Sequence, residues 1–139
     1  MPTNTQTLML VEDNPDEELL TLRELHKNGY SGLVVVARDG VETLDILLSI
    51  AEVALPQVVL LDLNLPKLSG LEVLRQLRGH ERTRRLPVVV FTSSCEDSDI
   101  LTSYLLGANS FVQKPIDSAA FRMAVRQIAI YWMNLNAAA

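Results

Sequence analysis

The chain has 139 residues, 48% of them hydrophobic and 21% charged, so it can form one folded domain and is too apolar to be disordered throughout. Its 12 Lys and Arg residues against 17 Asp and Glu residues give a net charge of −5, which argues against nucleic-acid binding through overall charge. The single cysteine, Cys95, excludes an intramolecular disulfide and a cysteine-based metal cluster.

We expect no membrane span and no secretion signal in this sequence. No apolar run approaches the roughly 20 residues that span a bilayer. The N-terminal sequence MPTNTQT has no basic residue and no long apolar stretch, unlike a secretion signal. We therefore predict a cytoplasmic protein with no membrane partner. We expect residues 1–139 to form a single domain, with its core over residues 7–134 and short loose tails.

Strands and helices are predicted to alternate along the chain. Short apolar runs, typical of buried strands, lie at 8–11, 33–37, 58–61, 88–91 and 110–112. Helical spacing of leucines and other apolar residues follows each run, at 14–28, 39–51, 69–79, 98–107 and 117–133. This (βα)₅ pattern predicts an α/β fold with a parallel sheet of five strands and helices on both faces.

Polar residues mark where several of these helices begin. Asn14, Asp39 and Asp117 each stand where an N-cap residue is expected. Ser69 followed by Glu72 predicts a capping box, in which each side chain bonds the other residue's backbone N–H. The acids after Asn14 are interpreted as favourable partners of the helix dipole.

The residues that end the predicted strands form one chemical set. The first strand ends in Glu12 and Asp13, the third in Asp62, the fourth in Thr92 and the fifth in Lys114. Ligands of open parallel sheets bind at the carboxyl ends of the strands, so these side chains should converge. The acids fit Mg²⁺ or Mn²⁺, and an aspartate can accept a phosphoryl group that a lysine and a hydroxyl stabilise. We predict that Asp62 accepts, Glu12 and Asp13 hold the metal, and Lys114 and Thr92 hold the phosphoryl group.

The same sheet architecture supports other functions. An aspartyl-nucleophile phosphatase would want an acid two residues after Asp62, where Asn64 stands. A metal-dependent nucleic-acid enzyme would want paired acids near Asp62. A flavin- or nucleotide-binding module would want a loop rich in glycine or hydroxyls after the first strand, where this chain is acidic. A metal-independent variant of the fold is disfavoured because every residue of the set is present.

Five short motifs at the strand ends give the chain a family resemblance. They are Glu12-Asp13, Asp62-Leu-Asn-Leu-Pro66, Ser69-Gly70, Phe91-Thr92-Ser93 and Phe111-Val-Gln-Lys114-Pro115. In this order they resemble the response-regulator receiver domain of two-component signalling, over about residues 7–134. The resemblance implies a flavodoxin-like sheet with strand order 2-1-3-4-5. It also implies a signalling phosphoacceptor rather than an enzyme, one that promotes only its own phosphotransfer and autodephosphorylation.

The resemblance also implies a role for each site residue. Asp62 corresponds to the phosphoacceptor, and Asp13 to a direct metal ligand. Glu12 corresponds to an acid that acts on the metal mainly through water. The backbone carbonyl of Asn64 completes the metal ligands that the protein supplies. Lys114 corresponds to the lysine that pairs with the phosphoryl group.

Three further residues match family positions that change on activation or fix the backbone. Thr92 corresponds to the hydroxyl that moves toward the phosphate, and Phe111 to the aromatic residue that turns inward. Pro115 corresponds to a proline that follows a cis peptide bond.

The last two helices are predicted to carry the output surface. Phe121, Val125, Ile128, Trp132 and Leu135 form an apolar core stripe, while other apolar residues, Met133 among them, lie off it. The resemblance implies a homodimer across the fourth helix, fifth strand and fifth helix. The dimer residues that we predict are Leu101, Tyr104, Tyr131 and Trp132.

The partner is predicted to be a histidine kinase. The Tyr131-Trp132 pair resembles single-domain regulators of bacterial, notably cyanobacterial, phytochrome kinases, which implies a phytochrome-type partner. Because only Asn-Ala-Ala-Ala follows the last helix, we expect no effector domain and an output through binding. The basic cluster between Arg75 and Arg85 is interpreted as a solvated helix end, with a docking patch as the alternative.

Overall fold

The computed structural model describes residues 6–28, 30, 32–94 and 96–137, so Cys95 lies outside the described residues. The strands are β1 (Thr7–Val11), β2 (Leu33–Ala37), β3 (Val58–Leu61), β4 (Val88–Thr92) and β5 (Ser110–Gln113). The helices are α1 (Pro15–Lys27), α2 (Gly40–Ser49), α3 (Gly70–Gly79), α4 (Asp97–Leu105) and α5 (Ser118–Ile130). Short 3₁₀ turns at Glu52–Ala54 and Glu81–Thr83 and a π-helical turn at Tyr131–Leu135 complete the order. None of the described helices is long and apolar enough to cross a membrane.

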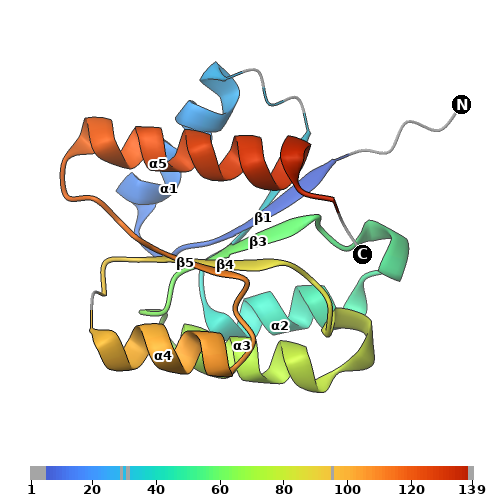
Figure 1. Ribbon diagram of the computed structural model, residues 1–139. Helices are drawn as coiled ribbons and strands as arrows, with labels where there is room; N and C mark the ends of the chain where they lie inside the picture. Colours follow the sequence, from blue (N-terminus) through green and yellow to red (C-terminus); the bar gives the residue numbers. More distant parts are fainter. Residues whose placement is uncertain (1–5, 29, 31, 95, 138–139) are drawn as a thin grey trace, which may run out of the picture.

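The five strands form one parallel sheet in the order β2-β1-β3-β4-β5, which confirms the predicted fold and strand order. Helices α1 and α5 cover one face of the sheet, and α2, α3 and α4 cover the other (Figure 1). The pairing register places Met9 beside Val35 on β2 and beside Val59 on β3. The central strands are therefore buried on both sides, as their continuous apolar runs predict.

Alternation along each strand divides the core into two layers. On β1, Leu8 and Leu10 pack in the cluster that contains Phe121 and Val125 of α5. Met9 and Val11 pack in the other cluster, with residues of α2 and α3. Because both layers are anchored on the same strands, the strand ends hold fixed positions relative to one another.

The helix caps agree with the sequence analysis in part. Asn14, Asp39, Ser69 and Asp117 accept hydrogen bonds from backbone N–H groups of the helices that they begin. The capping box at α3 is only half formed. Ser69 Oγ accepts from the N–H of Glu72, but the Glu72 carboxylate accepts from the side chains of Arg75 and Gln76. The predicted reciprocal bond is wrong, because these two donors on the next turn satisfy the carboxylate instead.

Gly70 lets helix α3 begin against the loop that carries Asp62. A Cβ atom at Gly70 would lie 2.3 Å from the carbonyl oxygen of Asp62 and 2.7 Å from Cα of Leu63. The N–H of Gly70 donates to the carbonyl of Leu63 at 3.0 Å. Only a residue without a side chain allows this approach, so Gly70 fixes the backbone beneath Asp62.

The end of the last helix departs from the predicted apolar stripe. The π-helical turn rotates the chain after Ile130, so Met133 is buried at 5% exposure and Leu135 is 69% exposed. The prediction that Leu135 belongs to the core is therefore wrong, and Met133 takes its place. Among the predicted tail residues that the structure describes, Gln6 donates to the carbonyl of Met133 and the N–H of Asn136 donates to the carbonyl of Tyr131.

Candidate functional site

The predicted site residues meet at the carboxyl end of the sheet. Glu12 and Asp13 follow β1, Asp62 follows β3, Thr92 ends β4 and Lys114 follows β5. All are buried except Asp13, which is exposed. Backbone hydrogen bonds hold them at the edge of the sheet, from the N–H of Asp62 to the carbonyl of Val11 and from the N–H of Lys114 to the carbonyl of Thr92.

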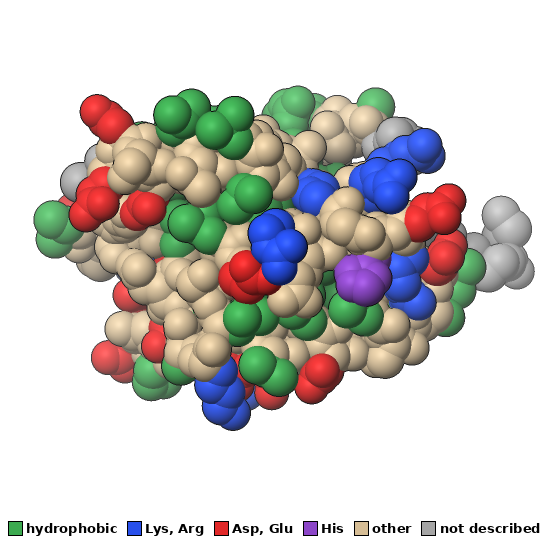
Figure 2. All heavy atoms as spheres, turned by 90° about the horizontal axis from the view of Figure 1, so that it is seen from below, with side chains coloured by type: hydrophobic (Ala, Val, Ile, Leu, Met, Phe, Trp, Pro, Cys, Tyr) green, Lys and Arg blue, Asp and Glu red, His purple; other side chains and the backbone are tan. Residues whose placement is uncertain are grey.

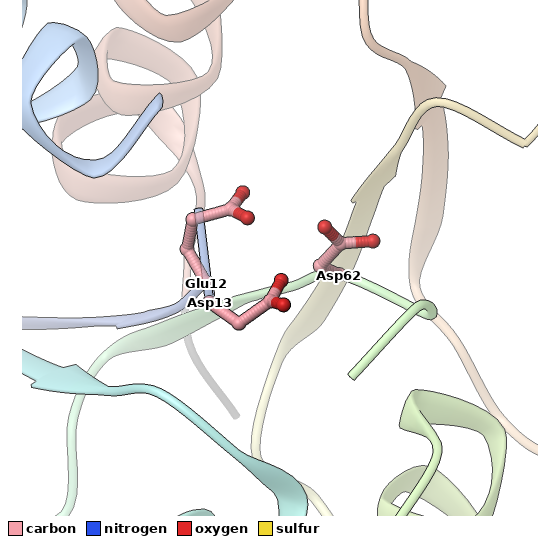
Figure 3. Close-up of side chains that lie close together, drawn as sticks. All are labelled: Glu12, Asp13 and Asp62. Atoms are coloured by element: carbon pink, nitrogen blue, oxygen red, sulfur yellow. The ribbon is translucent and has the colours of Figure 1, made fainter. Parts of the chain in front are cut away.

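The three carboxylates form one cluster. Glu12, Asp13 and Asp62 each offer an oxygen that lies within 4.8 Å of the others. Figure 3 shows the three side chains turned toward a common space, two from the end of β1 and one from the end of β3. Such a set of hard oxygen donors fits Mg²⁺ or Mn²⁺, with water and phosphate oxygens as the remaining ligands. The N–H of Asn64 donates to Asp62 Oδ1 at 3.1 Å, so Asn64 lies beside this cluster.

Lys114 places a positive charge among the acids. Its Nζ donates to Glu12 Oε1 at 2.5 Å and to Asp62 Oδ2 at 2.8 Å, and it lies 2.7 Å from Glu17 Oε1. Burial alone would lower the pKa of Lys114, but the carboxylates of Asp62, Glu12 and Glu17 outweigh that effect and hold the pKa above its usual value. Lys114 is thus a fixed cation in the pocket.

At Glu12 the effect of burial on the pKa outweighs the effect of the neighbouring charge, the reverse of Lys114. Burial raises the pKa of Glu12 from 4.5 to about 7, because removing the carboxylate from water outweighs its hydrogen bond and attraction to Lys114. The nearby charge of Asp62 raises it further. A divalent cation bound between these acids would favour the charged form of Glu12.

Thr92 contacts the same aspartate from β4. Its hydroxyl donates to Asp62 Oδ1 at 2.9 Å, and Thr92 is fully buried. Both carboxylate oxygens of Asp62 are therefore engaged, Oδ1 by Thr92 and the Asn64 N–H, and Oδ2 by Lys114. Phe111 is half-buried on β5, where it pairs with Val90 of β4, and its N–H donates to the hydroxyl of Tyr104 at 3.1 Å.

Two features of the site differ from the sequence analysis. The described peptide bonds include no cis bond, so the predicted cis bond before Pro115 is wrong for this structure. The trans form is the intrinsically favoured one before proline, and with it Lys114 reaches both carboxylates. The second feature is Glu17, which the sequence placed among ordinary helix-start acids and the structure places against Lys114. Only the packing of α1 against the end of β5 reveals this contact.

The basic cluster lies at the other end of the molecule. Lys and Arg side chains gather toward one end of the face formed by α2, α3 and α4 (Figure 2). Arg78 donates to the carbonyls of Thr83 and Gly107, and Arg82 donates to the carbonyl of Ile50. Arg75 pairs with Glu72. Several of these arginines thus hold the ends of helices and loops, which favours the structural interpretation over a docking patch.

The fold and the acidic pocket define a receiver domain. Residues 8–126 match the response regulator receiver domain family. The chain therefore belongs to that family, as the sequence motifs predict. A curated relative, the probable methanogenesis regulatory protein FilR2 of Methanothrix harundinacea (strain 6Ac), is 39% identical over 132 residues, which cover 93% of this chain and 84% of FilR2.

Solved structures of similar proteins include several phytochrome response regulators. The phosphorylated cyanobacterial phytochrome response regulator RcpA is 33% identical, with a TM-score of 0.89 over 96% of this chain and 97% of RcpA. The Mn²⁺-bound form of Rcp1, a response regulator of Synechocystis sp., is 29% identical, with a TM-score of 0.89 over 96% and 99% of the two chains. The bacteriophytochrome response regulator AtBRR is 44% identical, with a TM-score of 0.72 over 98% and 100%. This chain is thus a receiver-domain response regulator related to phytochrome response regulators.

Proposed function

We propose that this protein accepts a phosphoryl group from a histidine kinase on Asp62. The observation that carries the proposal is the convergence on one carboxylate of the Thr92 hydroxyl, the Lys114 ammonium and two further acids. In the transfer, an Asp62 oxygen attacks phosphorus as the bond from phosphorus to the kinase histidine nitrogen breaks. The product is an aspartyl-phosphate, and the electron pair leaves with the histidine.

Each neighbour of Asp62 has a part in this proposal. Lys114 neutralises the charge of the arriving phosphoryl oxygens, and Thr92 donates a hydrogen bond to one of them. Glu12, Asp13, Asp62 and the carbonyl of Asn64 would hold a Mg²⁺ or Mn²⁺ ion, which supplies further positive charge to the phosphoryl oxygens. The acidic cluster and the Mn²⁺-bound structure of Rcp1 support the metal.

The proposed switch begins at Thr92. In the structure its hydroxyl binds Asp62 directly, so phosphorylation would exchange this contact for one to the phosphoryl group. The movement of Thr92 makes room for Phe111 to turn inward. Because Tyr104 binds the N–H of Phe111, α4 and β5 respond together.

The partner that we propose is a phytochrome-type histidine kinase. The support is the similarity to RcpA, a cyanobacterial phytochrome response regulator, and to AtBRR, a bacteriophytochrome response regulator. Phosphotransfer profiling against the histidine kinases of the source organism should give the fastest transfer from a phytochrome kinase. A faster transfer from another class of kinase would contradict this assignment.

The acceptor assignment can be tested with acetyl phosphate. In the presence of Mg²⁺ we expect labelling of the unaltered chain, measured by intact-protein mass, and no labelling of Asp62→Asn. The variant Asp45→Asn, which removes a carboxylate from α2 outside the pocket, is the matched control and should be labelled normally. A folded Asp62→Asn variant that is still phosphorylated would refute the assignment.

Chelation tests the metal. With EDTA in place of Mg²⁺, labelling by acetyl phosphate should fall to background, since the clustered carboxylates then lack the cation that offsets their charge. Adding excess Mg²⁺ should restore it. Undiminished labelling in EDTA would contradict the roles of Glu12 and Asp13.

We also propose that two copies of the chain associate through α4, β5 and α5. Leu101 and Tyr104 are exposed on α4, and Tyr131 is exposed in the π-helical turn that follows α5. Trp132 packs edge-on against Tyr131 with ring centroids 5.1 Å apart. Exposed apolar residues on adjoining helices are typical of an interface.

The double variant Tyr131→Glu/Trp132→Glu should weaken the dimer, because it places two charges in an apolar contact. Analytical ultracentrifugation with and without beryllofluoride measures the association. Val53→Glu is the matched control, since Val53 is 97% exposed and lies outside α4, β5 and α5. If the unaltered chain is dimeric and the double variant sediments identically, this interface is excluded.

A further inference from the structure

Three carboxylates surround the ammonium group of Lys114. Glu12 Oε1, Glu17 Oε1 and Asp62 Oδ2 lie 2.5, 2.7 and 2.8 Å from Nζ. Two of the three N–H donors of the lysine ammonium bond Glu12 and Asp62, and Glu17 lies within ion-pair distance of the same nitrogen. A phosphoryl oxygen that binds Lys114 must therefore share the ammonium with the nearby Glu17 carboxylate.

Of the three carboxylates, only Glu17 contacts Lys114 without an aligned hydrogen bond. Glu12 and Asp62 both accept aligned hydrogen bonds from Nζ, whereas the buried Oε1 atom of Glu17 has no aligned hydrogen-bond donor. The Glu17 side chain is 33% exposed, against 4% for Glu12 and 8% for Asp62. Glu17 thus supplies negative charge to Lys114 without fixing its direction.

Glu17 also has space in which to leave Lys114. It lines a cavity of about 270 Å³ together with residues that include Ser93, Lys114 and Ile116. It comes from the first turn of α1, whereas Glu12 and Asp62 come from strand ends in the centre of the sheet. Its side chain can therefore move without disturbing the strand ends.

We infer that Glu17 competes with the phosphoryl group for Lys114 and so weakens the phosphorylated state. The inference rests on the proposed function of Asp62. A phosphoryl group adds about −1.5 to −2 charge by analogy with other phosphorylated residues, and the Glu17 carboxylate repels this charge across a partly buried pocket. Glu17 acts through Lys114, so it is a positioning residue that sets how available the lysine is.

The test is the binding of beryllofluoride, a phosphoryl analogue, with excess Mg²⁺. Measured by ¹⁹F NMR, the variant Glu17→Gln should bind the analogue about three- to fivefold more tightly than the unaltered chain, as expected for the loss of one partly screened charge pair. A second titration measures Mg²⁺ alone, by ¹⁵N–¹H chemical shifts. Here Glu17→Gln should bind no more tightly, because removing a nearby negative charge cannot favour a cation. A merely structural defect would weaken both.

Asp16→Asn is the matched control. This substitution removes the same charge from the same helical turn. Asp16 is exposed and is not among the carboxylates that contact Lys114. Its affinity for beryllofluoride should change less than about 1.5-fold, the scale of a screened surface charge. An equal gain in Asp16→Asn would assign the effect to the helix terminus and overturn the role of Glu17.

The possible failures are distinguishable. If the unaltered chain binds beryllofluoride and Glu17→Gln gains nothing, the inference is wrong and the proposed function stands. If the unaltered chain binds no beryllofluoride while Mg²⁺ is present, the proposed function fails and the inference fails with it.

Discussion

Burying each charged side chain of the pocket costs desolvation free energy, which the close opposite charges offset. Lys114 and Glu12 are both buried, and each would be expelled or neutralised without the other. Burial raises the pKa of Glu12 and so favours its neutral form, whereas the carboxylates raise the pKa of Lys114 and keep it charged where a phosphoryl group and a cation are proposed to bind. Such perturbed groups at a strand-end cluster are typical of functional sites.

Glu12 makes the stability of the metal-free protein depend on pH. Its pKa is 4.5 in the unfolded chain and about 7 in the fold, so the native state binds more protons between these values. Protonated Glu12 is tolerated in the fold, so its full contribution to the free energy of unfolding is present below pH 4.5. This contribution is lost as the pH rises through 7 and the buried carboxyl ionises. Glu12→Gln lacks this decline, so in EDTA its stability relative to the unaltered chain should rise by about 1–3 kcal/mol from pH 4.5 to 7.5.

Urea unfolding at the two pH values measures this difference. Glu52→Gln removes an exposed glutamate from a 3₁₀ turn outside the pocket and should follow the unaltered chain at both. A Glu12→Gln difference that is the same at pH 4.5 and 7.5 would contradict the effect of burial on Glu12.

Sequence reasoning could find the site residues that end strands, because a buried apolar run followed by a polar residue marks the edge of a parallel sheet. Asp62, Thr92 and Lys114 were predictable on this ground, and the structure brings them within hydrogen-bonding distance. Glu17 was not, since its contact depends on how α1 packs beside the end of β5. The backbone isomer at Pro115 also depends on tertiary context, which a motif does not carry.

At the scale of elements, starts were more predictable than ends. An N-cap is a local interaction, so Asn14 and Asp117 identify the beginnings of α1 and α5 from sequence alone. The end of α5 is set by a π-helical turn that no local residue pattern announces. A π-helical turn holds about one residue more than an α-helical turn, and this shift buries Met133 and exposes Leu135.

This exchange predicts unequal costs of truncation at two neighbouring apolar positions. Met133→Ala should lower the free energy of unfolding by about 2 kcal/mol or more, because it leaves a cavity in the core layer beneath α5. Leu135→Ala should change it by less than about 0.5 kcal/mol, because that side chain is already exposed. Urea unfolding of the two variants gives the comparison. Equal costs, or a larger cost at Leu135, would favour the regular helix that the apolar stripe predicts.

At the scale of the whole molecule, the alternation of strands and helices was sufficient to predict a parallel sheet with two helical layers. The order of the strands came from the family resemblance, since periodicity alone does not say which strand is central. The structure confirms that order and places β1 and β3 beside each other, which is what brings Glu12 and Asp13 to Asp62.

Metal binding should stabilise the entire fold. A ligand that binds only the native state adds RT ln(1 + [L]/Kd) to the free energy of unfolding, about 2.7 kcal/mol when Mg²⁺ is present at 100 times its Kd. Thermal unfolding with Mg²⁺ and with EDTA should therefore give a higher midpoint with Mg²⁺. Asp13→Asn should lose most of this increase, while Asp16→Asn should keep it. An equal increase in both variants would place the ion outside the acidic cluster.

The ion pair between Lys114 and Glu12 joins residues that are 102 positions apart in the chain. Neither partner reaches the other until β1 and β5 belong to the same sheet, with β3 and β4 between them. No segment that lacks either strand can therefore present the complete pocket, so the phosphotransfer that we propose requires both ends of the sheet to be in place. A truncated chain without β5 should therefore lack Lys114 at the acidic cluster even if the rest of the sheet forms.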